Sequence, residues 1–348
     1  MEKASCCVLA FAKYKNKIGF VPINFNMFIM YDYISGENTV LLLEKESISK
    51  EILYSCCVQC GEYAVFIPLH GKHFLIVDMN TCELSYIDVP LCNGEKPDGC
   101  LFSNGYYIDD FVYAIGYRYP GIVKINIKTK VCENIEFGDN LGKGGLSYSN
   151  VINDKHEIIM VTRDNVIIQY TVDDDKLKKI TEFNGKIDWN KADRMDMWLT
   201  NNVDEMLFRY ANRNEYVDGV KIKNLTQRYN KGTYRYCVKY GEKLLILPEN
   251  NCSIIVYDIM GNFLCELWIN REKKIGFSVM RYFVETGLLY IADNMKKATY
   301  IIDEELNVRE MLFPLDKRLL LERWMELECN HNIINEGLVK LDTFLSNM

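Results

Sequence analysis

The chain of 348 residues lacks the features that mark several classes of protein. It has only 7 Pro and no run rich in Pro, Gly or Ser that could serve as an interdomain linker. No stretch approaches the roughly 18 apolar residues that cross a bilayer. Residues 1–5 run into a strand-like segment without the apolar core of a signal peptide. These absences predict one continuous all-β domain in the cytoplasm, with no membrane association.

A surplus of basic residues is also missing. The 41 Lys and Arg residues stand against 48 Asp and Glu residues, which gives a net charge of −7 at pH 7. Nucleic-acid binding depends on clustered Lys and Arg side chains that neutralise phosphates. The composition therefore predicts that nucleic acid is not a partner.

Cysteine is present but lacks a disulfide pattern. The 13 cysteines are odd in number and spread over the whole chain, so we expect reduced thiols. The string Ser-Cys-Cys-Val occurs at residues 5–8 and 55–58, and Cys237-Val238 repeats its second half. We interpret these strings as equivalent positions on the first strand of a repeated unit, where small side chains fit and thiols pack as compact hydrophobic groups.

A repeat of about 45 residues dominates the chain. Pro and Asp stand ten positions apart in three segments, 22–32, 68–78 and 248–258. The markers of successive units are Asp32, Asp78, Asn126, Tyr170, Asp258 and Asp303. Their spacings are 46, 48, 44, 88 and 45 residues, and the interval of 88 residues indicates one further unit within residues 195–230. The repeat therefore predicts seven units.

Within each unit, short runs rich in Val, Ile, Tyr and Phe are closed by turn residues every 8 to 12 positions, a β pattern. The second unit divides into strands over residues 52–59, 63–68, 73–78 and 83–89. Four-stranded units of this size bury their faces by stacking radially on their neighbours. We predict an all-β, seven-bladed β-propeller of four-stranded antiparallel blades over residues 1–314.

The C-terminal residues 315–348 follow a different pattern. Leu320, Trp324 and Leu327, and then Ile334 and Leu338, fall at helical spacing. We predict a short helical extension packed on the propeller, and a ring that closes without strand exchange between the termini.

The repeat resembles the streptogramin lyase-like and lactonase-like propellers. The segments Asn251–Asp258 and Asp78-Met79-Asn80-Thr81 are similar to their blade motif, a turn with Asn followed by a strand that ends in Asp. The resemblance covers residues 4–314 and describes blade architecture. Streptogramin lyases use a His and an acidic metal site at the axis. Since the last predicted blades contain no His, the resemblance does not imply that activity.

Several local patterns suggest sites, each with a structural alternative. Cys57 and Cys60 have the spacing of zinc ligands, but no further pair follows, and a strand thiol and a turn thiol explain them. His70 and His73 could share a metal or act as acid and base, or lie at a solvated hairpin tip. The acidic run 173–175 is expected to form a solvated turn. We predict no metal and no cofactor.

One propeller face carries the turns between second and third strands and the connections between blades. The candidate ligand-binding residues expected there are Asn24, His70, Arg118, Tyr119, Arg163, Trp189, Arg213, Asn250 and Asn294. Arginines and amides around an axial funnel suit an anionic or polyhydroxylated ligand.

Two functions fit this face. The leading hypothesis is a non-catalytic binding or scaffold propeller with a protein or carbohydrate partner. The alternative is a lyase or hydrolase, with His70 as base and Arg118 or Arg163 holding an anionic substrate.

Overall fold

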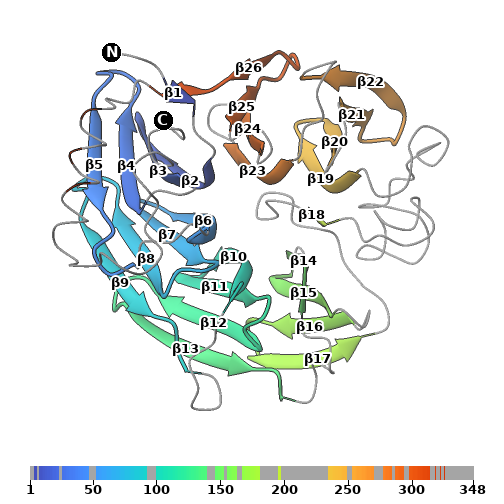
Figure 1. Ribbon diagram of the computed structural model, residues 1–348. Coiled ribbons are helices and arrows are strands. Elements are labelled where there is room, and N and C mark those ends of the chain that lie inside the picture. The colour runs from blue at the N-terminus through green and yellow to red at the C-terminus, as the bar shows by residue number, and fades with distance from the viewer. Residues whose placement is uncertain are drawn as a thin grey trace. The chain divides into compact units, whose positions relative to one another are not determined.

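The computed structural model describes residues 4–5, 8–22, 26–46, 52–91, 99–138, 146–152, 155–162, 167–180, 195–196, 234–248, 253–269, 277–283, 287–293, 298–313, 318, 322 and 325. These residues form antiparallel sheets in which strands adjacent in sequence pair with one another (Figure 1). The all-β antiparallel architecture predicted from the sequence is confirmed.

Six sheets of four or five strands follow one another along the described part of the chain. The first holds β2 (Val8–Tyr14), β3 (Lys17–Pro22), β4 (Met27–Asp32) and β5 (Asn38–Leu42). The second holds β6 (Tyr54–Cys60), β7 (Tyr63–Pro68), β8 (His73–Asp78) and β9 (Leu84–Asp88). The third holds β10 (Phe102–Ile108), β11 (Phe111–Gly116), β12 (Gly121–Asn126) and β13 (Val131–Glu136).

The same order continues in the later sheets. The fourth holds β14 (Leu146–Ile152), β15 (Glu157–Thr162), β16 (Ile167–Thr171) and β17 (Lys176–Ile180). The fifth holds β18 (Met195–Asp196), β19 (Tyr234–Tyr240), β20 (Lys243–Pro248), β21 (Ser253–Asp258) and β22 (Phe263–Trp268). The sixth holds β23 (Phe277–Phe283), β24 (Leu288–Asp293), β25 (Ala298–Ile302) and β26 (Val308–Glu310).

The predicted extra unit at residues 195–230 lies outside the described residues, apart from β18, which pairs with β19 of the fifth sheet. A count of seven blades therefore stays a prediction. By contrast, the strands of the second unit begin and end within two residues of the predicted bounds.

The Asp or Asn marker of the repeat closes the third strand of several sheets. Oδ1 of Asp78 accepts hydrogen bonds from the backbone amides of Asn80 (2.8 Å) and Thr81 (3.1 Å). Asp32 binds two amides in the same way, and so does Oδ1 of Asn126. A short side-chain acceptor at this position stabilises the turn into the fourth strand. The ten-residue interval in the sequence therefore recurs because each unit needs a side-chain acceptor at the turn that follows its third strand.

The first strand of each sheet is irregular at one repeated place. The register of β6 against β7 shifts between Tyr54 and Cys56, and that of β10 against β11 shifts between Phe102 and Asn104. The serine skipped in each case donates through Oγ to a carbonyl of the second strand, Ser55 to Ile67 and Ser103 to Ile115, both at 3.3 Å. A β-bulge of this kind bends the strand and increases its twist.

The interpretation of the Ser-Cys-Cys-Val strings as equivalent positions was wrong. Val8 pairs with Pro22 at the start of β2, just as Tyr54 pairs with Pro68 at the start of β6. Val8 is therefore equivalent to Tyr54, and Val58 lies four positions further along its strand. The recurrence at residues 5–8 therefore carries no structural repeat. Cys237-Val238 does occupy the positions of Cys57-Val58, because Tyr234 pairs with Pro248 just as Tyr54 pairs with Pro68.

Two apolar layers separate the first three sheets. One layer lies between the first and second sheets and contains Cys57, Phe28 and Phe66, whose two rings meet edge to face at 5.7 Å. The other lies between the second and third sheets and contains Cys56 and Cys60. Alternation along β6 therefore sends neighbouring thiols into opposite layers.

The termini differ from the prediction. The first and sixth sheets have four strands of their own, but β1 (Ala4–Ser5) pairs antiparallel with β27 (Leu312–Phe313). Neither of these two sheets takes a strand from the other end of the chain, as expected, but the separate two-residue ladder of β1 and β27 joins the two ends, which the sequence did not predict. Of the tail, only residues 318, 322 and 325 are described, with Arg318 Nε 3.2 Å from Glu322 Oε1. A helical extension stays a prediction.

The chain divides into two compact units. Residues 1–135, 297–300 and 310–348 form one unit, and residues 136–296 and 301–309 form the other. The first three sheets lie in the first unit, which also holds the candidate site described below.

Candidate binding site at the turns of the second and third sheets

Equivalent turns join the second and third strands of the second and third sheets. In the second sheet, His70 N donates to Ile52 O at 3.2 Å, and in the third, Arg118 N donates to Cys100 O at 3.1 Å. Leu101 N then donates to Leu69 O at 2.7 Å and links the two sheets. The repeat therefore places His70 and Arg118 at the same position of successive turns, on the predicted face.

The link between the sheets brings a thiol next to an imidazole. Sγ of Cys100 lies 3.3 Å from Nε2 of His70, and both side chains are partly buried. Cys100 comes from the connection between β9 and β10, whereas His70 belongs to the turn between β7 and β8. A neutral imidazole nitrogen at this distance can accept the thiol proton.

The Arg118 guanidinium lies over Gly99. A Cβ built on Gly99 would stand 2.7 Å from Nη1 of Arg118, so any larger residue would displace the guanidinium. Gly99 also has φ +83°, a conformation that glycine adopts without strain. The Arg118 side chain is exposed, and no carboxylate among the described residues forms an ion pair with it.

Tyr119 is a core residue. It is 1% exposed and its ring stacks on Phe102, with the centroids 4.9 Å apart. Phe102 in turn contacts the ring of Phe74 at 5.1 Å. The aromatic stack fixes the backbone of the turn that presents Arg118.

We use the name Cys100 site for His70, Cys100 and Arg118 together with Gly99. Of the other predicted ligand-binding residues, only Tyr119 is described, and it lies in the core. Asn24, Arg163, Trp189, Arg213, Asn250 and Asn294 lie outside the described residues.

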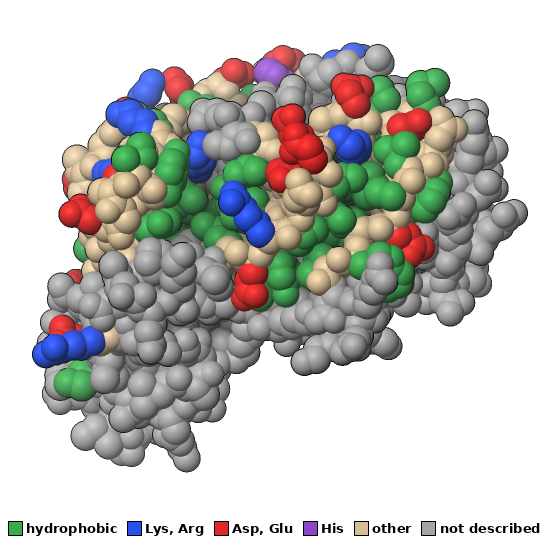
Figure 2. Space-filling model, turned by 90° about the horizontal axis from the view of Figure 1, so that it is seen from above, with side chains coloured by type: hydrophobic (Ala, Val, Ile, Leu, Met, Phe, Trp, Pro, Cys, Tyr) green, Lys and Arg blue, Asp and Glu red, His purple; other side chains and the backbone are tan. Residues whose placement is uncertain are grey.

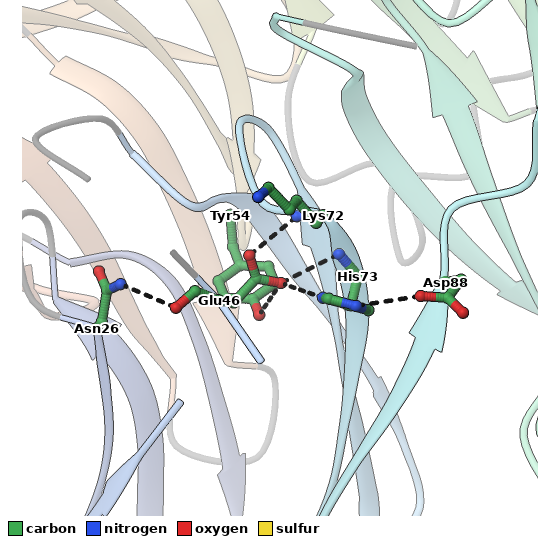
Figure 3. Close-up of polar contacts among 6 residues, drawn as sticks. All are labelled: Asn26, Glu46, Tyr54, Lys72, His73 and Asp88. Atoms are coloured by element: carbon green, nitrogen blue, oxygen red, sulfur yellow. Dashed lines mark hydrogen bonds and ion pairs between the residues drawn. The ribbon is translucent and has the colours of Figure 1, made fainter. Parts of the chain in front are cut away.

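His73 enters a second arrangement, the Glu46 cluster of Glu46, Tyr54, His73 and Asp88 (Figure 3). Oε1 of Glu46 accepts hydrogen bonds from His73 N at 3.0 Å and lies 3.0 Å from His73 Nδ1, while Oε2 accepts from Lys72 N at 2.9 Å. His73 Nε2 lies 3.1 Å from Asp88 Oδ1. The imidazole thus stands between a fully buried carboxylate and an exposed one.

The buried carboxylate also affects its tyrosine neighbours. Burial raises the pKa of Tyr54 well above its usual value, and the charge of Glu46 adds to this effect. Burial and the same charge raise the pKa of Tyr86. Tyr54 therefore stays a neutral donor, with its hydroxyl 3.5 Å from Glu46 Oε1. The Glu46 cluster is internally satisfied and holds the turn between β7 and β8 against the connection between β5 and β6.

The metal-site alternatives find no support in the described part of the chain. Cys57 and Cys60 face opposite layers, and His70 and His73 contact different partners. No group of three or more His, Cys, Asp or Glu among the described residues could hold a metal ion. The acidic run 173–175 forms an exposed turn, as predicted.

Sequence reasoning missed Glu46, Asp88 and Cys100. Glu46 is 27 residues from His73, and Cys100 is 30 residues from His70. For the backbone position of Cys100 the repeat offered a signal, because Cys100 stands two positions before β10 as Ile52 stands two positions before β6, and each carbonyl accepts a hydrogen bond from the turn of its own sheet. Its contact with His70 of the neighbouring sheet had no such signal.

Charges of both signs mix on the surface. On the face in Figure 2, the described Lys and Arg side chains lie scattered among Asp and Glu side chains, with apolar side chains between them. Any anion recognition at the Cys100 site is therefore local and depends on Arg118.

No described helix is long and apolar enough to cross a membrane.

Comparison with known proteins establishes the fold and little more. No protein-family model and no curated protein matches the chain. Among solved structures, the tricorn protease is similar at 14% identity and TM-score 0.51, over 97% of this chain and 38% of that one. The virginiamycin B lyase from Staphylococcus aureus is similar at 9% identity and TM-score 0.46, over 90% and 89% of the two chains.

The WD40 repeats of RRP9 are similar at 9% identity and TM-score 0.43, over 88% of this chain and 80% of that one. All three structures are β-propellers. The likeness at these identities concerns the fold alone. The likeness to the tricorn protease, together with the repeated four-stranded antiparallel sheets, shows that the chain has the blade architecture of a β-propeller.

Proposed function

We propose that the protein is a non-catalytic binding propeller whose Cys100 site holds a carboxylate of a protein partner. One observation carries the proposal: the exposed Arg118 guanidinium lies over Gly99, the residue before Cys100, and the sulfur of Cys100 contacts the partly buried His70 imidazole. A fixed guanidinium binds a carboxylate through two parallel hydrogen bonds and loses little side-chain freedom on binding. We also propose a cytoplasmic location.

An acidic sugar would offer Arg118 the same carboxylate, so the test must separate the two partners. Wild-type protein is titrated calorimetrically with a poly-glutamate peptide and, separately, with an oligouronate. We expect binding of the peptide, weakened about tenfold or more in Arg118→Gln, because a hydrogen bond to a charged group contributes roughly 1.5–3 kcal/mol.

Lys176→Gln is the matched control. Lys176 is an exposed cation of another sheet, and its Nζ lies 3.8 Å from Asp174. Its substitution removes the same charge from the chain and should leave the affinity unchanged. Equal weakening by both substitutions would mean that net charge, and not the Cys100 site, attracts the peptide. Binding of the oligouronate alone would favour the carbohydrate partner.

A catalytic function is the second candidate. The 3.3 Å contact between Cys100 Sγ and His70 Nε2 favours it, because a base beside a nucleophile is the pair that covalent catalysis requires. Turnover of an ester or amide substrate that disappears in His70→Gln would support this function over simple binding.

A further inference from the structure

The cysteines of the described chain differ in their surroundings. Cys56, Cys57 and Cys60 are buried in the layers between sheets. Cys132 and Cys265 are partly buried, and burial raises the pKa of both thiols. Cys100 is partly buried too, but its sulfur faces an imidazole nitrogen. These differences single out Cys100 as a potentially reactive thiol.

A thiol reacts as its thiolate, so a neighbouring base changes its reactivity. At pH 7 an ordinary thiol of pKa about 8.5 is only about 3% ionised. If the proton of Cys100 passes to Nε2 of His70, the product is a thiolate next to an imidazolium, and each charge stabilises the other.

We propose that Cys100 is a site of reversible covalent modification, at which a small disulfide that carries carboxylates, of the type of glutathione disulfide, forms a mixed disulfide with the protein. The Cys100 sulfur attacks one sulfur of the small disulfide, and the bond between its two sulfurs breaks. A new S–S bond joins Cys100 to one half of the molecule. The other half leaves as a thiolate and takes up the proton that His70 accepted from Cys100. The small disulfide is the oxidant of this step, because Cys100 is oxidised to the mixed disulfide while the leaving half is reduced to a thiol.

Arg118 gives the reaction its selectivity. A carboxylate of the incoming disulfide binds the guanidinium and brings the sulfur bond to Cys100. In this reaction and in the proposed function Arg118 holds the anion, so the preference for a charged disulfide rests on the proposed function. Modification would also cover Arg118 and compete with a protein partner.

The test compares the Cys100 thiol with the thiol of Cys82 in the second sheet. Cys82 is also partly buried, but it lies in the turn between β8 and β9, at the opposite end of the strands from His70. Folded protein is treated at pH 7 with glutathione disulfide, and in parallel with neutral iodoacetamide, and each site is quantified by peptide mass spectrometry. We expect Cys100 to react at least about ten times faster than Cys82 with both reagents.

Two variants separate the roles. His70→Gln should slow Cys100 about tenfold with both reagents and shift its rate profile to higher pH, which a purely structural role of His70 would not do. Arg118→Gln should slow the reaction with glutathione disulfide and leave iodoacetamide unaffected. Unchanged thermal midpoints confirm that both variants are folded.

Equal rates at Cys100 and Cys82 would overturn the proposed modification site. If wild-type protein still binds poly-glutamate in that case, the proposed function survives. If Arg118→Gln alters neither the disulfide reaction nor peptide binding, both proposals fail together. A reaction that depends on His70 but not on Arg118 would overturn the preference for an anionic disulfide.

Discussion

His70 lies in the turn between β7 and β8, and His73 begins β8 three residues later, yet their surroundings differ in every respect that decides a role. His73 stands between two carboxylates, and one of them is fully buried. His70 faces a thiol at the edge of the exposed face, close to a guanidinium. The His73 imidazole is part of a closed set of hydrogen bonds. The His70 imidazole lies next to groups that can still react or bind a ligand.

The comparison shows that neither the residue type nor its place near a turn tells whether a histidine has a structural or a functional role. The two roles differ in which elements supply the partner groups of the imidazole and in whether water reaches those groups. The Glu46 cluster uses its donors internally and should respond to mutation in stability. The Cys100 site should respond in binding and reactivity, with little change in stability.

We expect the largest effect from a substitution that disrupts the Glu46 cluster. Glu46→Ala removes a fully buried carboxylate that binds the amides of Lys72 and His73. Leaving these donors and the imidazole without an acceptor should lower the free energy of unfolding by about 3 kcal/mol. Urea unfolding followed by tryptophan fluorescence measures the change.

Glu44→Ala is the matched control, because Glu44 is exposed in the same connection between β5 and β6. We expect it to change the free energy of unfolding by less than about 0.5 kcal/mol. If both substitutions cost the same, the cluster does not stabilise the turn, and the contrast between the two histidines loses its basis.

The next effect compares the histidines directly. His73→Ala deprives Glu46 of the imidazole but leaves it both amide donors, so we expect a loss of about 1–2 kcal/mol. His70→Ala should cost less than about 0.5 kcal/mol. Thermal unfolding of the two variants under one buffer condition decides the order. A reversed order would assign the structural role to His70 and exclude it as a group poised for chemistry.

The fold was largely predictable because its signals are local. The strands of the second sheet follow from alternation and from turn residues that stand next to them in sequence. The interval between Pro68 and Asp78 spans one hairpin, so a short window contains it. The cysteine strings misled, because identical letters four positions out of register resemble a repeat unless the turns are aligned first.

The candidate site was only half predictable. The repeat gave His70 and Arg118, since both occupy the same turn position. It did not give Cys100 or Glu46, because their contacts depend on how the connection between two sheets returns over the turn. Tyr119 was predicted as a ligand-binding residue but is buried in the core. Its neighbour Arg118 is exposed, and nothing in the local sequence indicates that the two side chains point in different directions.

The smallest expected effect concerns the Asp marker at the other end of the sheets. The hydrogen bond from the Ser35 amide, with those from the Ile34 amide and the Asn16 side chain, holds the pKa of Asp32 below its usual value, although desolvation opposes the shift. Since the folded pKa lies below the unfolded one, the ionised carboxylate stabilises the fold above the unfolded pKa. That contribution is lost as the pH falls through the folded pKa.

Asp32→Asn tests this linkage, and the third sheet supplies its precedent, because Asn126 binds the same two amide positions through Oδ1. The variant keeps the acceptor and loses the charge. Its thermal midpoint should lie slightly below that of the wild type at pH 7. The difference between the two midpoints should disappear as the pH falls through the lowered pKa of Asp32, where the wild-type carboxyl becomes protonated. Asp32→Ala removes the acceptor, so the difference between its thermal midpoint and that of the wild type should remain at acidic pH. A constant difference for Asp32→Asn would show that the charge of Asp32 contributes nothing to the turn, and that Asp and Asn serve there only as acceptors.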